Sequence, residues 1–595
     1  MFRQKVREAI RLAIAELKRE GALPDFVIPE FSMAAPEDPA HGDYATNAAL
    51  VIAKLTGGKP VEIARLIAGK LKASEIAAAA IAGPGFVNLT LADGSLTGAL
   101  SAALRKPEQW WRSEAGKGKT VRVEYFQLNI AKRPHVGHLR SVVIGDAIKR
   151  MLLAFGYDAK SDTHVGDWGT QFGILLYAIK QLRFDVAGYM EDDPLARYEM
   201  LYSFYNQASQ DSALVERLKS QGWGSDTTDW QNIHERGKEE FVKLERGDPE
   251  NRKIWQRLVD ISMKKLGESA LRLGLAPFDM HRGESFYEPM MPEIVALALF
   301  KDVAKKTGDG AVVADLTADG LDEAVLIKSD GASTYLLRDL ATLKYMKETL
   351  NFTANLYVVD VRQSLHFKQV FRVAKRLGFE GVEESTHIEF GFMTLPEGPM
   401  STRKGTAIEL EALLFEAATK VSAIIKEKNP DLENRDLVAK AIGLGAIKYF
   451  DLSHHRRSDI VFRWHEVLTF EGNTGPYLQY THARFRSIVR KATNGTKGTK
   501  VPEGVALDPT EHRLLAAVLR LPEAIEDALK DYTPNTLANY LYTLAQLANE
   551  FYHSHPVLQE PDEAKRKLRL ALVSGVVLTL AKGLDLLGIQ APDEM

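Results

Sequence analysis

The spacing of apolar residues predicts that the chain begins with a helix inside a small mixed unit. One face of residues 2–17 is apolar at helical intervals, and acidic residues lie on other faces. Turn signals that contain glycine follow at residues 41–43 and 83–85. We therefore expect residues 1–104 to form a compact α+β unit. The apolar face of the helix consists of Phe2, Val6, Ile10, Ala13 and Leu17.

A strand, a helix and a second strand are predicted next. Residues 121–126 alternate apolar and polar positions as a half-buried strand does, and residues 139–155 are apolar at helical spacing up to Gly156. This order is typical of a parallel nucleotide-binding sheet. Residues 177–273 are helical and highly charged, which suits an insertion within that sheet. The candidate strands of its remainder are residues 311–314, 324–328, 356–361 and 387–392.

Beyond residue 405 the pattern is almost wholly helical, broken by a Gly/Thr/Lys linker at residues 494–504. The most apolar stretch, residues 570–581, contains Ser574 and Gly575 and is too short to span a bilayer. Acidic residues near the N-terminus argue against a transit peptide. We expect no membrane partner and a cytoplasmic location.

Composition narrows the possibilities further. A chain of 595 residues is too long for one core, so several domains are expected. A net charge of −3 gives no overall attraction to nucleic acid, and any such partner must bind local patches. The absence of cysteine excludes disulfides and thiolate zinc sites, which fits a reducing compartment.

The sequence HVGH at residues 135–138 joins the first predicted strand to the helix that follows it. His135 and His138 therefore lie at a helix N-terminus, where free N–H groups favour a phosphate chain placed over Gly137. Two solvated or core histidines at a helix cap are the alternative, and for an isolated tetrapeptide that alternative is favoured.

A second loop makes phosphate binding the favoured interpretation of the two histidines. Residues 398–405 place the hydroxyl of Ser401 and the cations of Arg403 and Lys404 between two glycines. Such a loop is able to close over a triphosphate and stabilise its charge, although an ordinary basic surface turn has the same composition.

Together the two loops resemble the paired signatures of class I aminoacyl-tRNA synthetases. Seven short sequence motifs resemble those of the arginyl family. They occur in the same order as in that family and span most of the chain, and the motif that begins at His164 is the most specific of them. These words are NIAK (129–132), HVGHLRS (135–141), IGD (144–146), HVGDWGTQFG (164–173), TYLLRD (334–339), MSTRKG (400–405) and GPYLQYTHAR (475–484).

This resemblance implies an α/β protein with a class I Rossmann-type parallel-sheet catalytic domain, which carries a helical insertion. An N-terminal α+β domain and a C-terminal all-α helical bundle complete the expected architecture. The expected divisions are residues 1–115 for contact with the tRNA elbow, 116–405 for catalysis with the insertion at about 177–285, 406–455 for a connector that contacts the stem, and 456–595 for anticodon binding.

The implied activity is ATP-dependent attachment of L-arginine to its tRNA through an arginyl-adenylate, with AMP and pyrophosphate released. ATP and Mg²⁺ are the implied cofactors, no residue of a protein metal site is expected, and a monomer is the implied form. Activation needs positioning and positive charge around the phosphates. The implied catalytic residues are His135, His138, Lys132 and Lys404, and the implied ATP-binding residues are His135, Gly137, His138, Met400, Ser401, Arg403 and Lys404.

Arginine selection needs carboxylates arranged against a planar, charged guanidinium. Tyr335 and Asp339 are one helical turn apart and match the family's recognition pair, whereas an amphipathic helix with one solvated polar residue is the alternative. The implied arginine-binding residues are Glu124, Asn129, His138, Tyr335, Asp339 and Gln363. The implied tRNA-binding residues are Phe86, Asn88 and Tyr540, although Phe86 in a buried turn and Tyr540 in a helical core are alternatives.

The chain also departs from the family pattern. Phe126-Gln127-Leu128 precedes Asn129 where the family commonly has Ser-Pro, and Pro399 replaces the first lysine of the usual KMSKS word. Lys404 or Lys132 is able to supply the missing cation. A class I synthetase for another amino acid, a small-molecule adenylyltransferase and a catalytically silent tRNA-binding paralogue are the other hypotheses.

Overall fold

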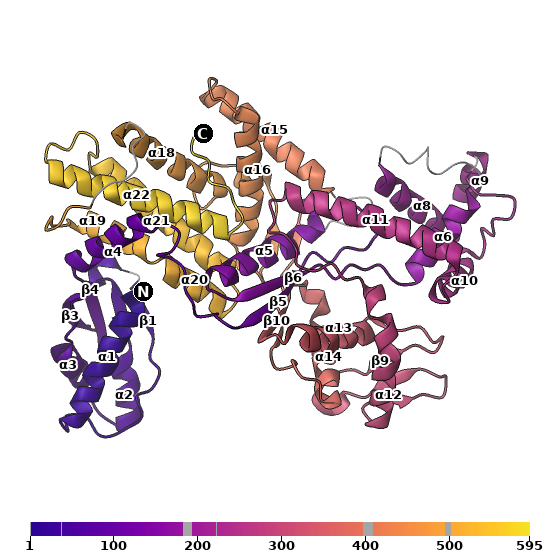
Figure 1. Cartoon of the computed structure of the whole chain (residues 1–595), viewed down its shortest axis with the longest axis horizontal. Helices are drawn as coiled ribbons and strands as arrows, with labels where there is room; N and C mark the ends of the chain where they lie inside the picture. Colours follow the sequence, from indigo (N-terminus) through magenta and orange to yellow (C-terminus); the bar gives the residue numbers. More distant parts are fainter. Residues whose placement is uncertain (1, 37, 183–192, 222, 397–407, 494–500) are drawn as a thin grey trace. The chain divides into compact units, whose positions relative to one another are not determined.

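The computed structural model describes residues 2–36, 38–182, 193–221, 223–396, 408–493 and 501–595 (Figure 1). These residues form two compact units, each assembled from separated segments of the chain. Unit 1 comprises Met1–Ser113, Lys420–Ser453 and His465–Met595. Unit 2 comprises Glu114–Thr419 and His454–Trp464.

Unit 1 combines a small antiparallel sheet with helices. The sheet has the order β1-β2-β4-β3, and the predicted N-terminal helix is confirmed as α1, with Val6, Ile10, Ala13 and Leu17 buried. The elements of its N-terminal part are α1 (Phe2–Arg19), β1 (Met33–Ala34), β2 (Tyr44–Thr46), α2 (Ala48–Thr56), α3 (Pro60–Lys70), β3 (Ile76–Ala82), β4 (Phe86–Leu91) and α4 (Asp93–Arg105). Its other long helices are α16 (Arg435–Leu452), α18 (Gly475–Thr493), α19 (Pro509–Leu519), α20 (Leu521–Lys530), α21 (Pro534–Ser554) and α22 (Glu563–Leu586).

Unit 2 is built on a parallel sheet with the order β11-β10-β5-β6, which confirms the predicted nucleotide-binding architecture. Its strands are β5 (Thr120–Glu124), β6 (Asp158–Asp162), β10 (Ala354–Tyr357) and β11 (Ser385–His387). Helix α5 (Leu139–Ala154) joins β5 to β6 and is buried along most of its length (Figure 1). Gly145 of α5 leaves room for Tyr125, because a Cβ atom at Gly145 would lie 2.3 Å from that ring.

Two of the expected sheet strands belong elsewhere. β8 (Val312–Ala314) and β9 (Ala324–Ile327) pair antiparallel with each other, and β7 (Lys305–Lys306) completes a separate sheet. The connection between β8 and β9 is too short for the crossover that parallel pairing requires. This sheet packs with α12 (Met291–Phe300), α13 (Tyr335–Leu350) and α14 (Ser364–Leu377) around one apolar core.

The helical insertion is present, although it begins before the predicted position. Its helices are α6 (Thr170–Gln181), α8 (Pro194–Ala208), α9 (Ser212–Ser220), α10 (Ile233–Glu245) and α11 (Pro249–Arg272). Aromatic and aliphatic side chains of these helices form a core of their own. Helices α6 and α10 approach each other at two glycines, since a Cβ atom on Gly173 would lie 1.9 Å from the carbonyl oxygen of Gly237.

This close approach leads to a stability prediction. Gly173→Ala should lower the stability of unit 2 by about 1–3 kcal/mol or more, because the new methyl group must push the backbone of α10 away. Thermal unfolding measures the change in Tm. Gly267→Ala on α11 is the matched control, since nothing lies within 4 Å of its added Cβ atom and alanine is the better helix former. A Tm for Gly173→Ala equal to that of Gly267→Ala would contradict the packing argument.

Candidate active site

The candidate active site lies at the edge of the parallel sheet where the order in which strands are added reverses. After β5 the chain adds β6 on one side and later β10 on the other, so the C-terminal end of β5 is a topological switch point. The last residue of β5, Glu124, is in register with Asp162 of β6 and with Tyr357 of β10. All three side chains are buried. Ligands of open parallel sheets bind at such an edge.

The histidine loop lies directly after β5 and leads into α5. The N–H of His135 donates to Nδ1 of His138 over 3.1 Å, and the N–H of Gly137 donates to Nδ1 of His135 over 3.1 Å. The two rings are 3.9 Å apart between centroids. Because both Nδ1 atoms accept, the proton of each neutral ring lies on Nε2.

Both imidazoles are neutral at pH 7 in this geometry. Burial, together with the neighbouring His135, lowers the pKa of His138 to about 3. Burial and the nearby Lys132 also lower the pKa of His135. The histidines therefore offer N–H donors to a phosphate rather than positive charge, and any cations must come from other side chains.

The predicted pair Tyr335 and Asp339 lies in the first turns of α13. Asp339 is half-buried, with 15% of its side chain exposed; it bonds Nε2 of His366 over 2.5 Å, and Nε2 of His164 lies 4.0 Å away. Burial alone would raise the pKa of Asp339, but the two histidines outweigh burial and lower it. Tyr335 is 61% exposed, with the guanidinium of Arg338 5.2 Å from its ring centroid. Asp339 is thus an ionised carboxylate below an accessible tyrosine.

Glu284 is a further buried carboxylate that the sequence analysis missed. Its backbone N–H donates to the carbonyl of Val165 over 3.0 Å, which fixes it beside the word that begins at His164. Arg338 forms an ion pair with it at 3.3 Å. Burial raises the pKa of Glu284 to about 7 despite Arg338 and His164. No periodicity marks this residue in the sequence, so only the fold places it here.

Glu124, which we expect to face the guanidinium of the substrate, also has partners within the protein. Arg122 bonds its Oε2, and the amide of Gln127 donates to its Oε1 over 3.1 Å. The alternation of a strand places Arg122 and Glu124 on the same face, and burial forces them to pair.

Three other predicted residues surround this edge. Asn129 is exposed and forms a parallel bridge with Gly166, where a Cβ atom would lie 2.3 Å from the Asn129 Oδ1 atom. Lys132 is half-buried, and its ammonium lies 5.8 Å from the ring centroid of Tyr202. Gln363 is exposed at the end of the short 3-10 helix η6 (Val361–Gln363).

The second signature loop lies outside the described residues. This applies to the predicted ATP-binding residues Met400, Ser401, Arg403 and Lys404. The described residues just after them return to the histidine loop: the N–H of Val136 donates to the carbonyl of Ile408 over 3.0 Å. The N–H of Leu410 likewise donates to the carbonyl of Pro134 over 3.1 Å.

Unit 1 contains a cavity of about 640 Å³ between the end of α18, the end of α21 and the C-terminal residues. The guanidinium of Arg484 lies 4.7 Å from the ring centroid of Tyr480 and 5.4 Å from that of Tyr552. Residues that line the cavity include Tyr480, Arg484, Lys491, Tyr552, His555 and Met595. A cation between two aromatic rings suits a nucleotide, because bases stack on aromatic and guanidinium planes and phosphates bind cations.

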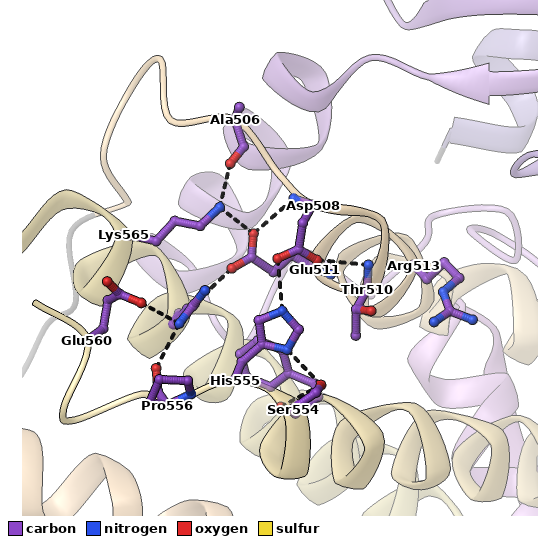
Figure 2. Close-up of polar contacts among 12 residues, drawn as sticks. Ala506, Asp508, Thr510, Glu511, Arg513, Ser554, His555, Pro556, Glu560 and Lys565 are labelled. Carbon is purple, nitrogen blue, oxygen red and sulfur yellow. Dashed lines mark hydrogen bonds and ion pairs between the residues drawn. The ribbon is translucent and has the colours of Figure 1, made fainter. Parts of the chain in front are cut away.

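An ionic cluster around the buried Glu511 lies next to the segment, from His555 onward, that lines this cavity (Figure 2). Glu511 is fully buried and accepts from Nε of Arg569 over 2.9 Å and from Nζ of Lys565 over 2.6 Å, as Figure 2 shows in part. Asp508 caps α19 and bonds Nε2 of His555 over 2.9 Å. The cluster therefore anchors the segment that begins at His555, whose residues line the cavity.

The predicted tRNA-binding residues occupy different surroundings. Phe86 is 39% exposed at the start of β4, whereas Asn88 is buried between β2 and β3. Tyr540 of α21 donates its hydroxyl to the carbonyl of Ala517 over 2.8 Å and does not line the cavity at Tyr552.

Among the described helices, none is long and apolar enough to cross a membrane.

The histidine geometry gives a testable prediction. NMR of protein labelled with ¹⁵N-histidine should show His138 with an unprotonated Nδ1 and a protonated Nε2 from about pH 8 down to about pH 5.5, because its pKa lies far below the ordinary value of about 6.5. Loss of the signal in His138→Asn identifies it. A titration of His138 with a midpoint between about pH 6 and 7 would contradict the neutral pair.

Comparisons with known proteins agree with this arrangement. Three family models match: "Arginyl tRNA synthetase N terminal domain" at residues 4–91, "tRNA synthetases class I (R), catalytic domain" at 99–464 and "DALR anticodon binding domain" at 478–595. The chain is 38% identical to an arginine–tRNA ligase of Chloroflexus aurantiacus over 98% of each chain. It is 36% identical to one of Pseudomonas syringae over the whole of each.

The overall fold is also similar to that of a solved structure. The Thermus thermophilus arginyl-tRNA synthetase is similar over the whole of both chains, with a TM-score of 0.79 and 29% sequence identity. A class I parallel sheet, a paired histidine loop at its switch point and a model match over most of the chain together identify the family. The chain belongs to the arginyl-tRNA synthetases, a family of class I aminoacyl-tRNA synthetases.

Proposed function

We propose that the protein attaches L-arginine to its tRNA at the expense of ATP, through an arginyl-adenylate, with release of AMP and pyrophosphate. The observation that supports this most strongly is a pair of carboxylates next to the word that begins at His164: Glu284, which is buried, and Asp339, whose side chain is only 15% exposed. A permanently charged guanidinium requires such a pair, whereas most other amino-acid side chains do not. Charging a tRNA pool with each of the twenty amino acids tests the proposal, and arginine alone should be attached.

In the activation step, the carboxylate of arginine attacks the α-phosphorus of ATP and pyrophosphate departs. ATP enters as its Mg²⁺ complex. The Nε2–H groups of His135 and His138 donate to the phosphates, and the positive end of the α5 dipole favours them, which stabilises charge as it moves onto the leaving group. Positive charge comes from Lys132 and from the segment that contains Ser401, Arg403 and Lys404.

Arginine binds with its guanidinium towards Asp339 and its carboxylate towards the histidine loop. Tyr335 covers the side chain, and Glu124 and Glu284 are the other carboxylates at this end. Asn129, at the bridge to Gly166, and Gln363, at the end of η6, hold the two ends of the substrate by hydrogen bonds. In the second step, a hydroxyl of the terminal tRNA adenosine attacks the carbonyl of the adenylate and displaces AMP.

The tRNA binds through unit 1. Phe86 stacks at the elbow, and the cavity between Tyr480, Arg484 and Tyr552 takes an anticodon base. The proposal includes domain boundaries at about residues 115, 405 and 455. It also includes a monomeric protein located in the cytoplasm. The catalytic words argue against a silent paralogue, and the helical tRNA-binding part argues against a small-molecule adenylyltransferase.

Asp339→Asn tests the guanidinium pocket. This change keeps the size of the side chain but removes its charge, and it leaves a buried guanidinium partly unpaired, which costs roughly 3–5 kcal/mol. The KM for arginine should rise by ~10²-fold or more, while the KM for ATP stays within a few-fold. Glu348→Gln, an exposed acid on the same helix, should leave both constants unchanged. An unchanged KM for arginine in Asp339→Asn would sink the pocket assignment.

Tyr552→Ala tests the cavity of unit 1. Loss of one stacking surface costs ~1–3 kcal/mol per base, so the KM for tRNA should rise by ~10-fold or more. The KM values for arginine and ATP should remain within about twofold. Tyr552→Phe is the control, because it keeps the ring and should keep the affinity for tRNA. Equal tRNA kinetics in the alanine and phenylalanine variants would show that the base binds elsewhere.

A further inference from the structure

His512 joins two parts of unit 1 that lie far apart in the sequence, and the proposed reaction gives it no role. This residue belongs to α19. Its Nε2 atom bonds Oδ2 of Asp43 over 3.0 Å, and its Nδ1 atom bonds Oδ1 of Asp93 over 2.8 Å. Asp43 directly precedes β2, and Asp93 is the first residue of α4. One ring therefore links the N-terminal module, residues 2–105, to the C-terminal bundle, helices α19–α22.

The two contacts require a particular protonation state of the ring. A carboxylate oxygen only accepts hydrogen bonds, a neutral imidazole has one N–H, and an imidazolium has two. Only the imidazolium form of His512 therefore donates to both Asp43 and Asp93. Backbone groups fix both acceptors: the N–H of Leu91 donates to Oδ2 of Asp43 over 2.7 Å, and the N–H of Leu507 donates to the other carboxylate over 3.3 Å. The bond to Asp43, together with that to Asp93, raises the pKa of His512 against the effect of burial.

The charges around the ring do not replace its own. Arg520 bonds the carbonyl oxygen of Asp43, and its guanidinium lies 3.9 Å from Oδ1 of that residue. Arg513 is paired with an acid of α21 over 2.7 Å. Among the described residues, Asp93 forms an ion pair with His512 alone. His512 and Asp43 line a cavity of about 820 Å³, and the other charged residues that line it are Asp38, Asp508, Arg513 and Arg520.

The rest of this junction does not depend on a histidine. The hydroxyl of Tyr44 donates to Oε1 of Glu523 over 2.8 Å. NH1 of Arg3 donates to both carboxylate oxygens of Asp527 over 2.8 and 2.7 Å. Helix α4 also packs against α19 and α22. A change at His512 is therefore expected to loosen the junction without separating its parts.

We propose that His512 is a positioning residue for tRNA binding: its imidazolium holds the N-terminal module against the C-terminal bundle, and its deprotonation loosens this junction and weakens tRNA binding. The junction follows from the contacts of His512, whereas its effect on tRNA rests on the proposed function. The module carries Phe86 and the bundle carries Tyr552, which are at the two proposed contacts with tRNA. A fixed junction holds both contacts in place for one tRNA molecule, so binding costs less conformational freedom.

The pH dependence has a definite sign. Because folding raises the pKa of His512, its stabilisation is fully present below the unfolded value of about 6.5 and is lost as the pH rises through the folded value. Above that pH, one ring nitrogen presents a lone pair to a carboxylate, and repulsion replaces a hydrogen bond. The stability of unit 1 and the affinity for tRNA should both fall on the alkaline side.

NMR and thermal unfolding test the junction independently of tRNA. Protein labelled with ¹⁵N-histidine should show both ring nitrogens of His512 protonated at about pH 7, with a titration midpoint above about 6.5. His512→Gln identifies the signal and keeps one donor without a titratable charge. Its Tm should lie a few degrees below that of the wild type at about pH 6, and the difference should shrink towards about pH 9. Asp93→Asn, which removes one of the two charges, should lower the midpoint of His512.

Direct binding of a tRNA transcript that the enzyme charges with arginine tests the positioning role. Ionic strength is held constant, because salt governs phosphate contacts. The Kd of the wild type should rise by about 3-fold or more between about pH 6.5 and 8.5, whereas the Kd of His512→Gln should already be raised at the lower pH and change less. His41→Gln is the matched control, since His41 is an exposed histidine two residues before Asp43, and it should follow the wild type at both pH values.

The outcomes are distinct. A neutral His512 at pH 7 overturns the proposal, as does a Tm difference between the wild type and His512→Gln that stays constant with pH. Equal responses of the tRNA Kd to pH in these two proteins overturn the positioning role. If His512→Gln does not fold, Asp93→Asn decides: a Kd that rises at a lower pH than in the wild type supports the proposal, and an unchanged profile overturns it. Failure of the wild type to charge arginine would overturn the proposed function and the effect on tRNA, whereas the NMR and Tm measurements would still decide the junction.

Discussion

Buried charges at the edge of a parallel sheet must be paired, and the active site of this protein depends on that constraint. Parallel register brings Glu124, Asp162 and Tyr357 to one level, and the fold adds Asp339 and Glu284 from outside the sheet. Water cannot solvate these groups, so each unpaired charge would cost several kcal/mol. Arg122, His366 and Arg338 provide the pairing within the protein.

Burial has different effects at the two proposed ends of the site, one for the arginine side chain and one for the phosphates. At the proposed side-chain end, the histidines beside Asp339 lower the pKa of that carboxyl and keep it charged. At the phosphate end, burial makes His138 neutral, so the histidine loop contributes directed N–H groups and little net charge. The backbone here is held in unusual conformations, with positive φ at Phe126, Ala131 and His164. Strain of this kind persists only where surrounding packing fixes it, as the contacts of this loop do.

The sequence was sufficient to predict the architecture because strand alternation, helical spacing and the signature words all mark local structure. It also predicted that Tyr335 and Asp339 lie one turn apart on a helix, and α13 confirms this placement. Glu284 was missed because its place depends on a backbone contact with Val165, far away in the chain. The pairing of Glu124 with Arg122 was not predicted, because Arg122 looks like an ordinary polar position in an alternating pattern. Strands β8 and β9 were assigned to the wrong sheet because pairing partners are not encoded in local periodicity.

The central claim is that buried carboxylates select the charge of the guanidinium, and the binding of a neutral isostere measures this directly. Isothermal titration at fixed pH should compare arginine with citrulline, which has a similar shape but an uncharged ureido group. Because a neutral group leaves Asp339 and Glu284 without a cation, citrulline should bind at least ~10²-fold more weakly than arginine. Equal dissociation constants for the two ligands would contradict the account.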